Sequence, residues 1–286
     1  MKTSDLLDLI GDDGITQRVY SRRSVLKGSA ASTAALVLAG MPFGLAAIAT
    51  QAHAQGTAPS PAGLLALQLA LKLEYLEADF YNAGVTAFAS TFTQPEKDAI
   101  GQLAKHENAH VALLKGALGA SAPANVPHDY TGGGGTGNGP FPNWNKDKVE
   151  FLKLAQLFED TGVRAYKGQA PNLIADDYYL TVALRIHAVE ARHAAKIRRL
   201  RGQNAYITQA QFDTAYTATK AASGKSQVDL ATGVYTSTPV TEANTTEGGV
   251  NVVGLNGATA DRVTEAFDEP LDTASVVTIA GFFGVK

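Results

Sequence analysis

The amino-acid sequence predicts an all-α protein built on a four-helix bundle, with a long crossover between the second and third helices. Three observations lead to this prediction. Four segments place apolar residues at steps of three and four, which is the period of one helix face. The links within the first pair and within the second pair are short, whereas the link between the pairs is long. Each segment also carries ionisable residues near the middle of its apolar stripe.

The first two helices are bounded by recognisable capping signals. The first is expected to begin at Ser60-Pro61, a cap residue followed by proline, and to run to about Phe88. The second is expected to begin at the capping box Thr93-Gln94-Pro95-Glu96 and to end at Gly119. These signals place the turn of the first helix pair between residues 88 and 93.

The segment 121–145 separates the two helix pairs. It contains four prolines and a run of glycines, which neither a helix nor a central strand tolerates, so we expect a long surface crossover. The third helix is expected over 145–168 and the fourth over 175–202. The fourth ends in a basic turn that suits a helix C-terminus.

Residues 203–286 predict a loop-rich extension with one or two short helices. We expect a helix over 208–223, mostly loop with a hairpin over 225–265, and a final helix from Asp272 to about Phe283. The apolar side chains of the final helix need burial against the bundle or against a partner, such as a second copy in a homodimer. They are Val276, Val277, Ile279, Phe282 and Phe283.

The first 54 residues resemble a secretory leader with a twin-arginine address. Ser21-Arg22-Arg23-Ser24-Val25-Leu26-Lys27 precedes an apolar stretch, and the small-residue site Ala52-His53-Ala54 follows. We expect cleavage after Ala54 and a periplasmic or extracellular protein. The alternative is an uncleaved membrane anchor, because about 20 apolar residues just span a bilayer. The chain thus divides into the leader 1–54, the bundle 55–202 and the extension 203–286.

Composition restricts the chemistry. The chain has no cysteine, which excludes disulfides and thiolate metal sites, so any metal must be bound by histidine and carboxylates. With 24 basic and 27 acidic residues, the chain offers no broad basic field, and we expect no nucleic-acid partner.

The four apolar stripes contain carboxylates and imidazoles near mid-helix. An unpaired buried carboxylate costs several kcal/mol. Two divalent cations would balance four carboxylates if the imidazoles are neutral, as metal ligands must be. The residues concerned are Glu74 in the first helix, Glu107 and His110 in the second, Glu159 in the third, and Glu190 and His193 in the fourth.

The spacing of these residues is specific. Two Glu-x-x-His steps occur, whereas 11 glutamates and 6 histidines in a chain of this length predict about 0.2 by chance. A step of three brings both side chains to one helix face. Glu74 and Glu159 are each followed seven residues later by tyrosine, at Tyr81 and Tyr166. The halves therefore indicate an internal repeat about an approximate two-fold axis, with two metals about 3.5–4 Å apart.

This pattern resembles the ferritin-like di-iron and di-manganese carboxylate superfamily, in which two helices give a Glu and two give Glu-x-x-His. The run Leu73–Tyr81, the leader and the late Phe267–Leu271 are similar to a branch that includes exported bacterial members and plant desiccation-related proteins. The resemblance implies that all six residues named above are metal ligands.

Several residues near the predicted metal ligands have two interpretations. Glu77 is expected to support a ligand or to lie at the surface rather than to bind metal. Tyr81 and Tyr166 are either core aromatics with satisfied hydroxyls or groups that orient ligands. His187 either lines the site or, as we expect, is partly exposed. His106 is expected at the surface.

The predicted site suggests three functions. Ligation without sulfur suits iron or manganese, and zinc also fits. The first hypothesis is an exported di-metal oxidoreductase, peroxidase-like or catalase-like, that acts on peroxide or oxygen in stress protection. The second is a non-enzymatic desiccation, stress or surface protein with a structural metal pair. The third, an iron-storage cage, fits poorly with the long crossover and the extension. Membrane contact is expected only through an uncleaved leader.

Overall fold

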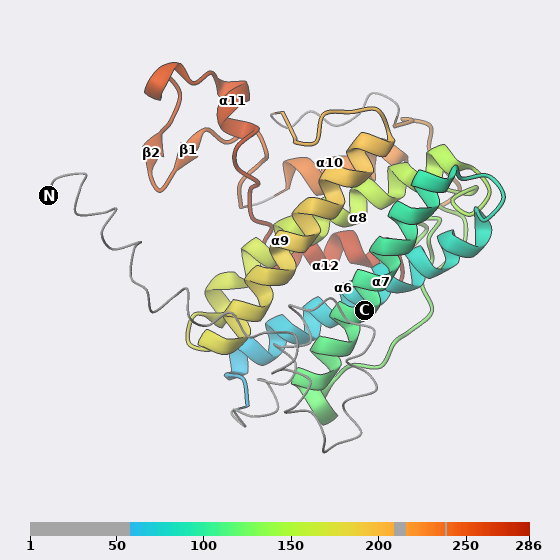
Figure 1. The fold of residues 1–286 in the computed structure, drawn as a ribbon, viewed down its shortest axis with the longest axis horizontal. Coiled ribbons are helices and arrows are strands. Elements are labelled where there is room, and N and C mark those ends of the chain that lie inside the picture. The colour runs from blue at the N-terminus through green and yellow to red at the C-terminus, as the bar shows by residue number, and fades with distance from the viewer. Residues whose placement is uncertain (1–57, 209–215, 238) are drawn as a thin grey trace, which may run out of the picture. The chain divides into compact units, whose positions relative to one another are not determined.

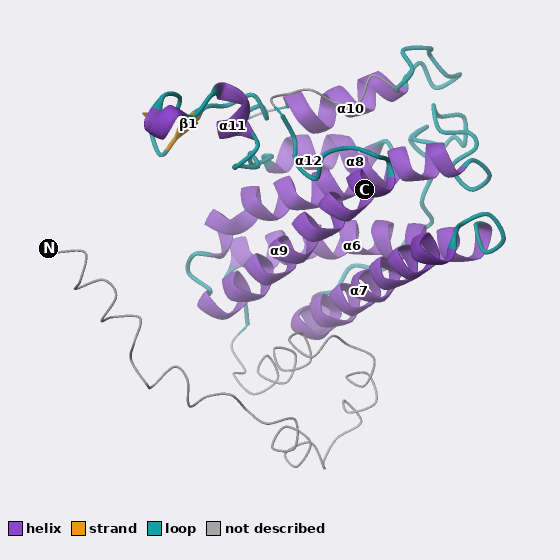
Figure 2. Cartoon of the chain, turned by 45° about the horizontal axis from the view of Figure 1, so that its top comes forward, coloured by secondary structure: helices purple, strands orange, loops and turns teal. Residues whose placement is uncertain are grey.

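The computed structural model describes residues 58–208, 216–237 and 239–286, so the leader and its expected cleavage point lie outside the described residues. Two helix pairs form the bundle: α6 (Pro61–Ala87) with α7 (Gln94–Leu118), and α8 (Lys148–Gln169) with α9 (Asp177–Leu200). Figures 1 and 2 show the two pairs packed together. The predicted all-α bundle is confirmed.

Capping side chains set where the helices begin. Ser60 Oγ accepts a hydrogen bond from Gly63 N of α6 at 3.1 Å, and Ser60 Oγ donates to Asp176, the residue before α9, at 2.5 Å. The predicted capping box at Thr93 is present at the start of α7. Asp147 caps α8, so this helix begins three residues after the predicted position. One shared contact therefore links the starts of α6 and α9.

The crossover between α7 and α8 begins after a 3-10 turn (η1, Gly119–Ser121) and contains no helix or strand from 122 to 147. The carboxylate of Asp129 accepts hydrogen bonds from the backbone N–H groups of Gly135 and Gly137, each at 2.9 Å. Gly139 is required because a Cβ there would lie 2.0 Å from the Thr131 carbonyl oxygen. This loop is also tied to the C-terminal segment by the Asp129 N to Phe283 O hydrogen bond at 2.8 Å.

The extension contains the remaining elements: α10 (Gln227–Thr236), a hairpin of β1 (Thr246–Glu247) and β2 (Val250–Asn251), the 3-10 turn η3 (Leu255–Gly257), α11 (Ala260–Thr264) and α12 (Thr273–Gly281). In the bundle, the 3-10 turn η2 (Ala170–Leu173) joins α8 to α9. The predicted hairpin and final helix are present.

The helix predicted over 208–223 is wrong at its described positions, 208 and 216–223, while 209–215 lie outside the described residues. The helix begins instead after Ser226. Ser226 Oγ accepts from Asp229 N at 3.2 Å, and Asp229 accepts from Ser226 N at 2.7 Å. This capping box was available in the sequence and marks the true start of α10.

The extension packs against α8. Helices α10 and α12 both contact α8, beside which they lie in Figure 1. The rings of Phe158 and Phe283 meet with centroids 4.7 Å apart, and Val276 and Ile279 are buried in the same core. Of the apolar residues of α12, Val277 is 48% exposed. Most of the apolar side chains of the final helix are thus buried within the chain itself.

Helix α8 is buried along most of its length because the bundle covers one side and the extension covers the other. Its Arg164 is fully buried and donates to the carbonyl oxygens of Glu269, at 2.7 Å, and Val240, at 2.6 Å.

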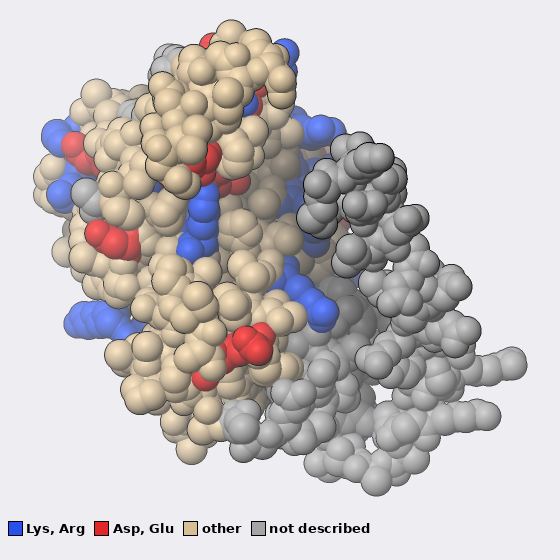
Figure 3. Space-filling model, turned by 90° about the vertical axis from the view of Figure 1, so that its left-hand side faces the viewer, with Lys and Arg blue, Asp and Glu red and all other residues tan. Residues whose placement is uncertain are grey.

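The surface is mixed in charge. On the face in Figure 3, basic and acidic side chains are interspersed among uncharged residues. Within the described part of the chain, no helix is both long and apolar enough to cross a bilayer.

Candidate metal centre

The six residues singled out on the helix stripes converge in the middle of the bundle. Each is at most 3% exposed, although all are ionisable. The three-residue step places the glutamate and histidine of α7 on one face, and the same step does so on α9. The convergent residues are Glu74 from α6, Glu107 and His110 from α7, Glu159 from α8, and Glu190 and His193 from α9.

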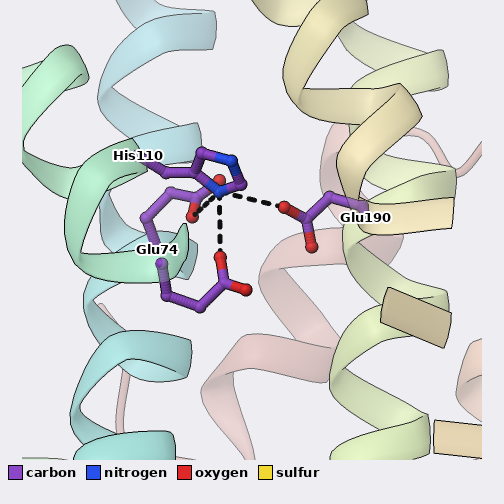
Figure 4. A group of neighbouring side chains, drawn as sticks. Glu74, His110 and Glu190 are labelled. Carbon is purple, nitrogen blue, oxygen red and sulfur yellow. Dashed lines mark hydrogen bonds and ion pairs between the residues drawn. The ribbon is translucent and has the colours of Figure 1, made fainter. Parts of the chain in front are cut away.

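Three carboxylates surround His110, and we name the four residues Glu74, Glu107, His110 and Glu190 the His110 subsite. His110 Nδ1 lies 3.1 Å from Glu74 Oε2, 2.9 Å from Glu107 Oε2 and 3.1 Å from Glu190 Oε1. Figure 4 shows Glu74 and Glu190 directed at the imidazole from separate helices. One atom from each of the four residues lies within 4.8 Å of the others.

The His193 subsite has the same construction on the other side. His193 Nδ1 lies 2.7 Å from Glu107 Oε1, 3.4 Å from Glu159 Oε2 and 3.8 Å from Glu190 Oε2. Its four ligand atoms also lie within 4.8 Å of one another.

The two subsites share Glu107 and Glu190. Each shared carboxylate turns one oxygen toward His110 and the other toward His193. This is the arrangement of a bridging carboxylate, and these buried groups can hold metal ions.

The unsatisfied atoms at the centre fit a cation. Within the described chain, no aligned hydrogen-bond donor reaches Glu159 Oε2 or either oxygen of Glu190. Buried acceptors without donors are costly. A metal ion bound by these oxygens would remove that cost.

Protons occupy the centre when metal does not. Burial by itself lowers the pKa of His110 and His193, but the surrounding carboxylates outweigh it and hold both pKa values well above the ordinary value. Burial raises the pKa of Glu74 to about 8. The metal-free centre is therefore partly neutralised by imidazolium and by protonated carboxyl groups, and metal binding must displace protons.

The two tyrosines hold carboxylates across the bundle. Tyr166 on α8 donates to Glu74 Oε1 on α6 at 2.5 Å, and Tyr81 on α6 donates to Glu159 Oε1 on α8. Burial, with the adjacent carboxylate, raises the pKa of both phenols well above the ordinary value, so both remain donors. The exchange of partners agrees with an approximate two-fold relation between the halves.

Glu77 lies inside the bundle rather than at its surface, with 3% of it exposed. A Cβ at Gly162 would lie 3.4 Å from Glu77 Oε1 and 3.3 Å from Glu190 Oε2, so this glycine leaves room for both carboxylates. Burial, with the nearby glutamates, raises the pKa of Glu77 well above the ordinary value. Glu77 also lines a small cavity together with Ile279 and Ala280 of α12.

His106 is not the surface residue that the sequence suggested. It is half-buried, its Nδ1 lies 2.8 Å from His193 Nε2, and the two rings stack at 5.0 Å. Burial, with His193, lowers the pKa of His106 to about 4, so it is neutral at pH 7. His187 is half-buried, as expected, and belongs to neither subsite.

A model of the ferritin-like domain matches residues 64–203, which span the four helices. The protein contains a ferritin-like domain. A model of the twin-arginine translocation signal sequence matches residues 19–39, so the ferritin-like domain is exported, to the periplasm or outside the cell. No curated protein and no solved structure matches the chain at a significant level.

The match to the ferritin-like domain ends where the extension begins, so α10, α12 and the hairpin lie outside it. Similarity to plant desiccation-related proteins stays a prediction. Within the ferritin-like domain, sequence reasoning missed the contact of His106. The available signal was its position next to Glu107, one residue off the inward stripe.

Proposed function

We propose that this exported ferritin-like protein binds two divalent metal ions at the centre of its bundle and reacts there with peroxide or oxygen. One observation supports this most strongly: two groups of four ligands overlap at Glu107 and Glu190. Four carboxylates balance two divalent cations when both imidazoles are neutral. Glu74 and His110 would complete one subsite, and Glu159 and His193 the other.

The donor set favours iron or manganese, and zinc also fits, because it combines carboxylates and imidazoles without sulfur. When bound, such a redox-active pair supplies two-electron exchange with a small oxidant. The phenols of Tyr81 and Tyr166 orient the terminal carboxylates, and the surrounding apolar core excludes bulk water. Because every ligand is at most 3% exposed, only small molecules such as peroxide or oxygen suit the centre as substrates.

The test is metal analysis together with turnover. Protein exported by its own leader and purified without chelator should contain two metals per chain and consume peroxide or oxygen. Glu107→Gln removes a shared carboxylate with little change of shape, so it should lose both metals and turnover while keeping its helical circular dichroism. Glu150→Gln, near the start of α8 and away from the centre, is the matched control. Fewer than two metals per wild-type chain would overturn the proposal.

A structural metal pair is the second candidate, and the sealed position of the ligands favours it. Metal that binds only the folded state stabilises by about 4 kcal/mol at a thousandfold excess over Kd. A chelator would then lower the melting temperature sharply while the metal-loaded protein consumed neither peroxide nor oxygen. Peroxide or oxygen consumption that depends on the metal would exclude this alternative.

A further inference from the structure

The two histidines of the centre differ in what holds their outer nitrogen. His193 Nε2 lies 2.8 Å from His106 Nδ1, and His106 Nε2 in turn lies 2.6 Å from the side-chain amide of the exposed Gln102. His110 Nε2 is buried, and no hydrogen-bond partner for it exists in the described part of the chain. The approximate two-fold symmetry of the ligands is therefore broken immediately outside them.

The sequence explains the break. The Glu-x-x-His step of α7 corresponds to that of α9, so the residue before Glu107 corresponds to the residue before Glu190. The first is His106 and the second is Val189. Valine has no polar side-chain atom and cannot offer His110 the contact that His106 gives His193.

The contact fixes one tautomer of His193. Its Nδ1 faces Glu107 and Glu159, so this nitrogen must be free of a proton to bind metal. The ring proton then resides on Nε2, which donates to His106 Nδ1. A hydrogen bond to the outer nitrogen orients a ligating imidazole and increases its basicity.

We propose that His106 is a positioning residue that makes the two subsites unequal, so that the His193 subsite binds its metal more tightly and fills first. This rests on the proposed function, because it requires both subsites to bind metal. Loss of such an outer partner typically weakens metal binding 10- to 100-fold. The His110 subsite, whose imidazole lacks this partner, should be unaffected by changes at His106.

The test compares two substitutions of similar shape. In His106→Asn the side-chain oxygen can replace Nδ1 as the acceptor, whereas His106→Leu has no acceptor. Metal-free full-length protein is titrated with Co²⁺, followed by visible absorption and calorimetry. Wild type should show two distinct Kd values. His106→Leu should raise the lower Kd 10- to 100-fold and leave the higher one unchanged, and His106→Asn should restore most of the tight binding. His187→Ala, on α9 but outside both subsites, should match wild type.

A spectroscopic readout separates positioning from general destabilisation. The Nε2 proton of His193 should give a slowly exchanging, Co²⁺-shifted NMR signal in wild type and in His106→Asn, and this signal should be lost to exchange in His106→Leu. Two equal Kd values in wild type, or unchanged Co²⁺ binding in His106→Leu, would overturn this inference while the proposed function stands. Failure of wild type to bind Co²⁺ would overturn both.

Discussion

Glu159 and Asp160 are consecutive residues of α8, yet their carboxylates lie in two different kinds of buried cluster. Glu159 faces the centre of the bundle, where the imidazole of His193 lies 3.4 Å from its Oε2 and the hydroxyl of Tyr81 donates to its Oε1. Asp160 faces the other way and accepts hydrogen bonds from both terminal nitrogens of Arg198, one at 2.6 Å, and from the hydroxyl of Tyr235. Both carboxylates are at most 2% exposed.

The difference lies in the source of the balancing charge. On the side of the extension, guanidinium groups of the chain itself neutralise the carboxylates, as in the Arg164–Glu242 pair at 2.7 Å. At the centre, the basic groups of the described chain that pair with the carboxylates are imidazoles. The carboxylate of Asp160 is thus balanced by the chain itself, and Tyr235 of α10 joins it to the extension, whereas the carboxylates at the centre are balanced only by an added cation or by protons.

The largest expected effect comes from breaking the self-sufficient cluster. Arg198→Ala leaves Asp160 buried without its cation, which should lower the free energy of unfolding by about 3–5 kcal/mol. Because this cluster does not depend on metal, the loss should be the same with and without chelator, measured by urea unfolding. Arg199→Ala, at the exposed neighbouring position, is the control. A loss that appears only in the metal-bound protein would contradict the separation of the two clusters.

The second effect is pH dependence and belongs to the centre. The folded-state pKa of Glu74 is raised from 4.5 to about 8 by burial, and those of His110 and His193 are raised by the carboxylates. At these three groups the folded chain then holds protons more tightly than the unfolded chain, so their contribution to metal-free stability should fall as pH rises above the unfolded pKa values, through about pH 8 for Glu74. The slope is about 1.4 kcal/mol per pH unit for each proton concerned.

Metal binding should reverse this trend, because a metal competes with the same protons and binds more tightly as pH rises. Thermal unfolding from pH 5 to 9 should therefore give curves for chelated and metal-saturated protein that diverge as pH increases. Parallel curves would mean that the buried glutamates do not exchange protons for metal.

The smallest effect concerns the tyrosines. Tyr166→Phe removes the hydrogen bond to Glu74, which should lower stability by about 1 kcal/mol and weaken metal binding about 10-fold. Tyr75→Phe is the matched control, since its hydroxyl contacts the Pro123 carbonyl at 3.3 Å, away from the centre. Isothermal titration with Co²⁺ measures the metal affinity of each variant. Equal affinities for the two variants would remove the orienting role of Tyr166.

The sequence was sufficient for features that repeat along a helix and insufficient for those that depend on packing between elements. Apolar periodicity and caps located α6 to α9, and the Glu-x-x-His steps located the residues that converge at the centre. His106 and Glu77 lie off or at the edge of the inward stripe, so only the approach of neighbouring helices buries them. In the extension, the apolar periodicity is weak. The burial of Arg164 on α8 depends on backbone carbonyl groups of the extension, which no sequence pattern identifies.

The most direct test of the central claim is a crystal structure of the metal-loaded protein with anomalous diffraction collected at the iron, manganese and zinc absorption edges. We expect two anomalous peaks about 3.5–4 Å apart, one in the His110 subsite and one in the His193 subsite, with Glu107 and Glu190 between them. A centre without anomalous peaks, whose glutamates turn toward water or toward arginine, would contradict the account.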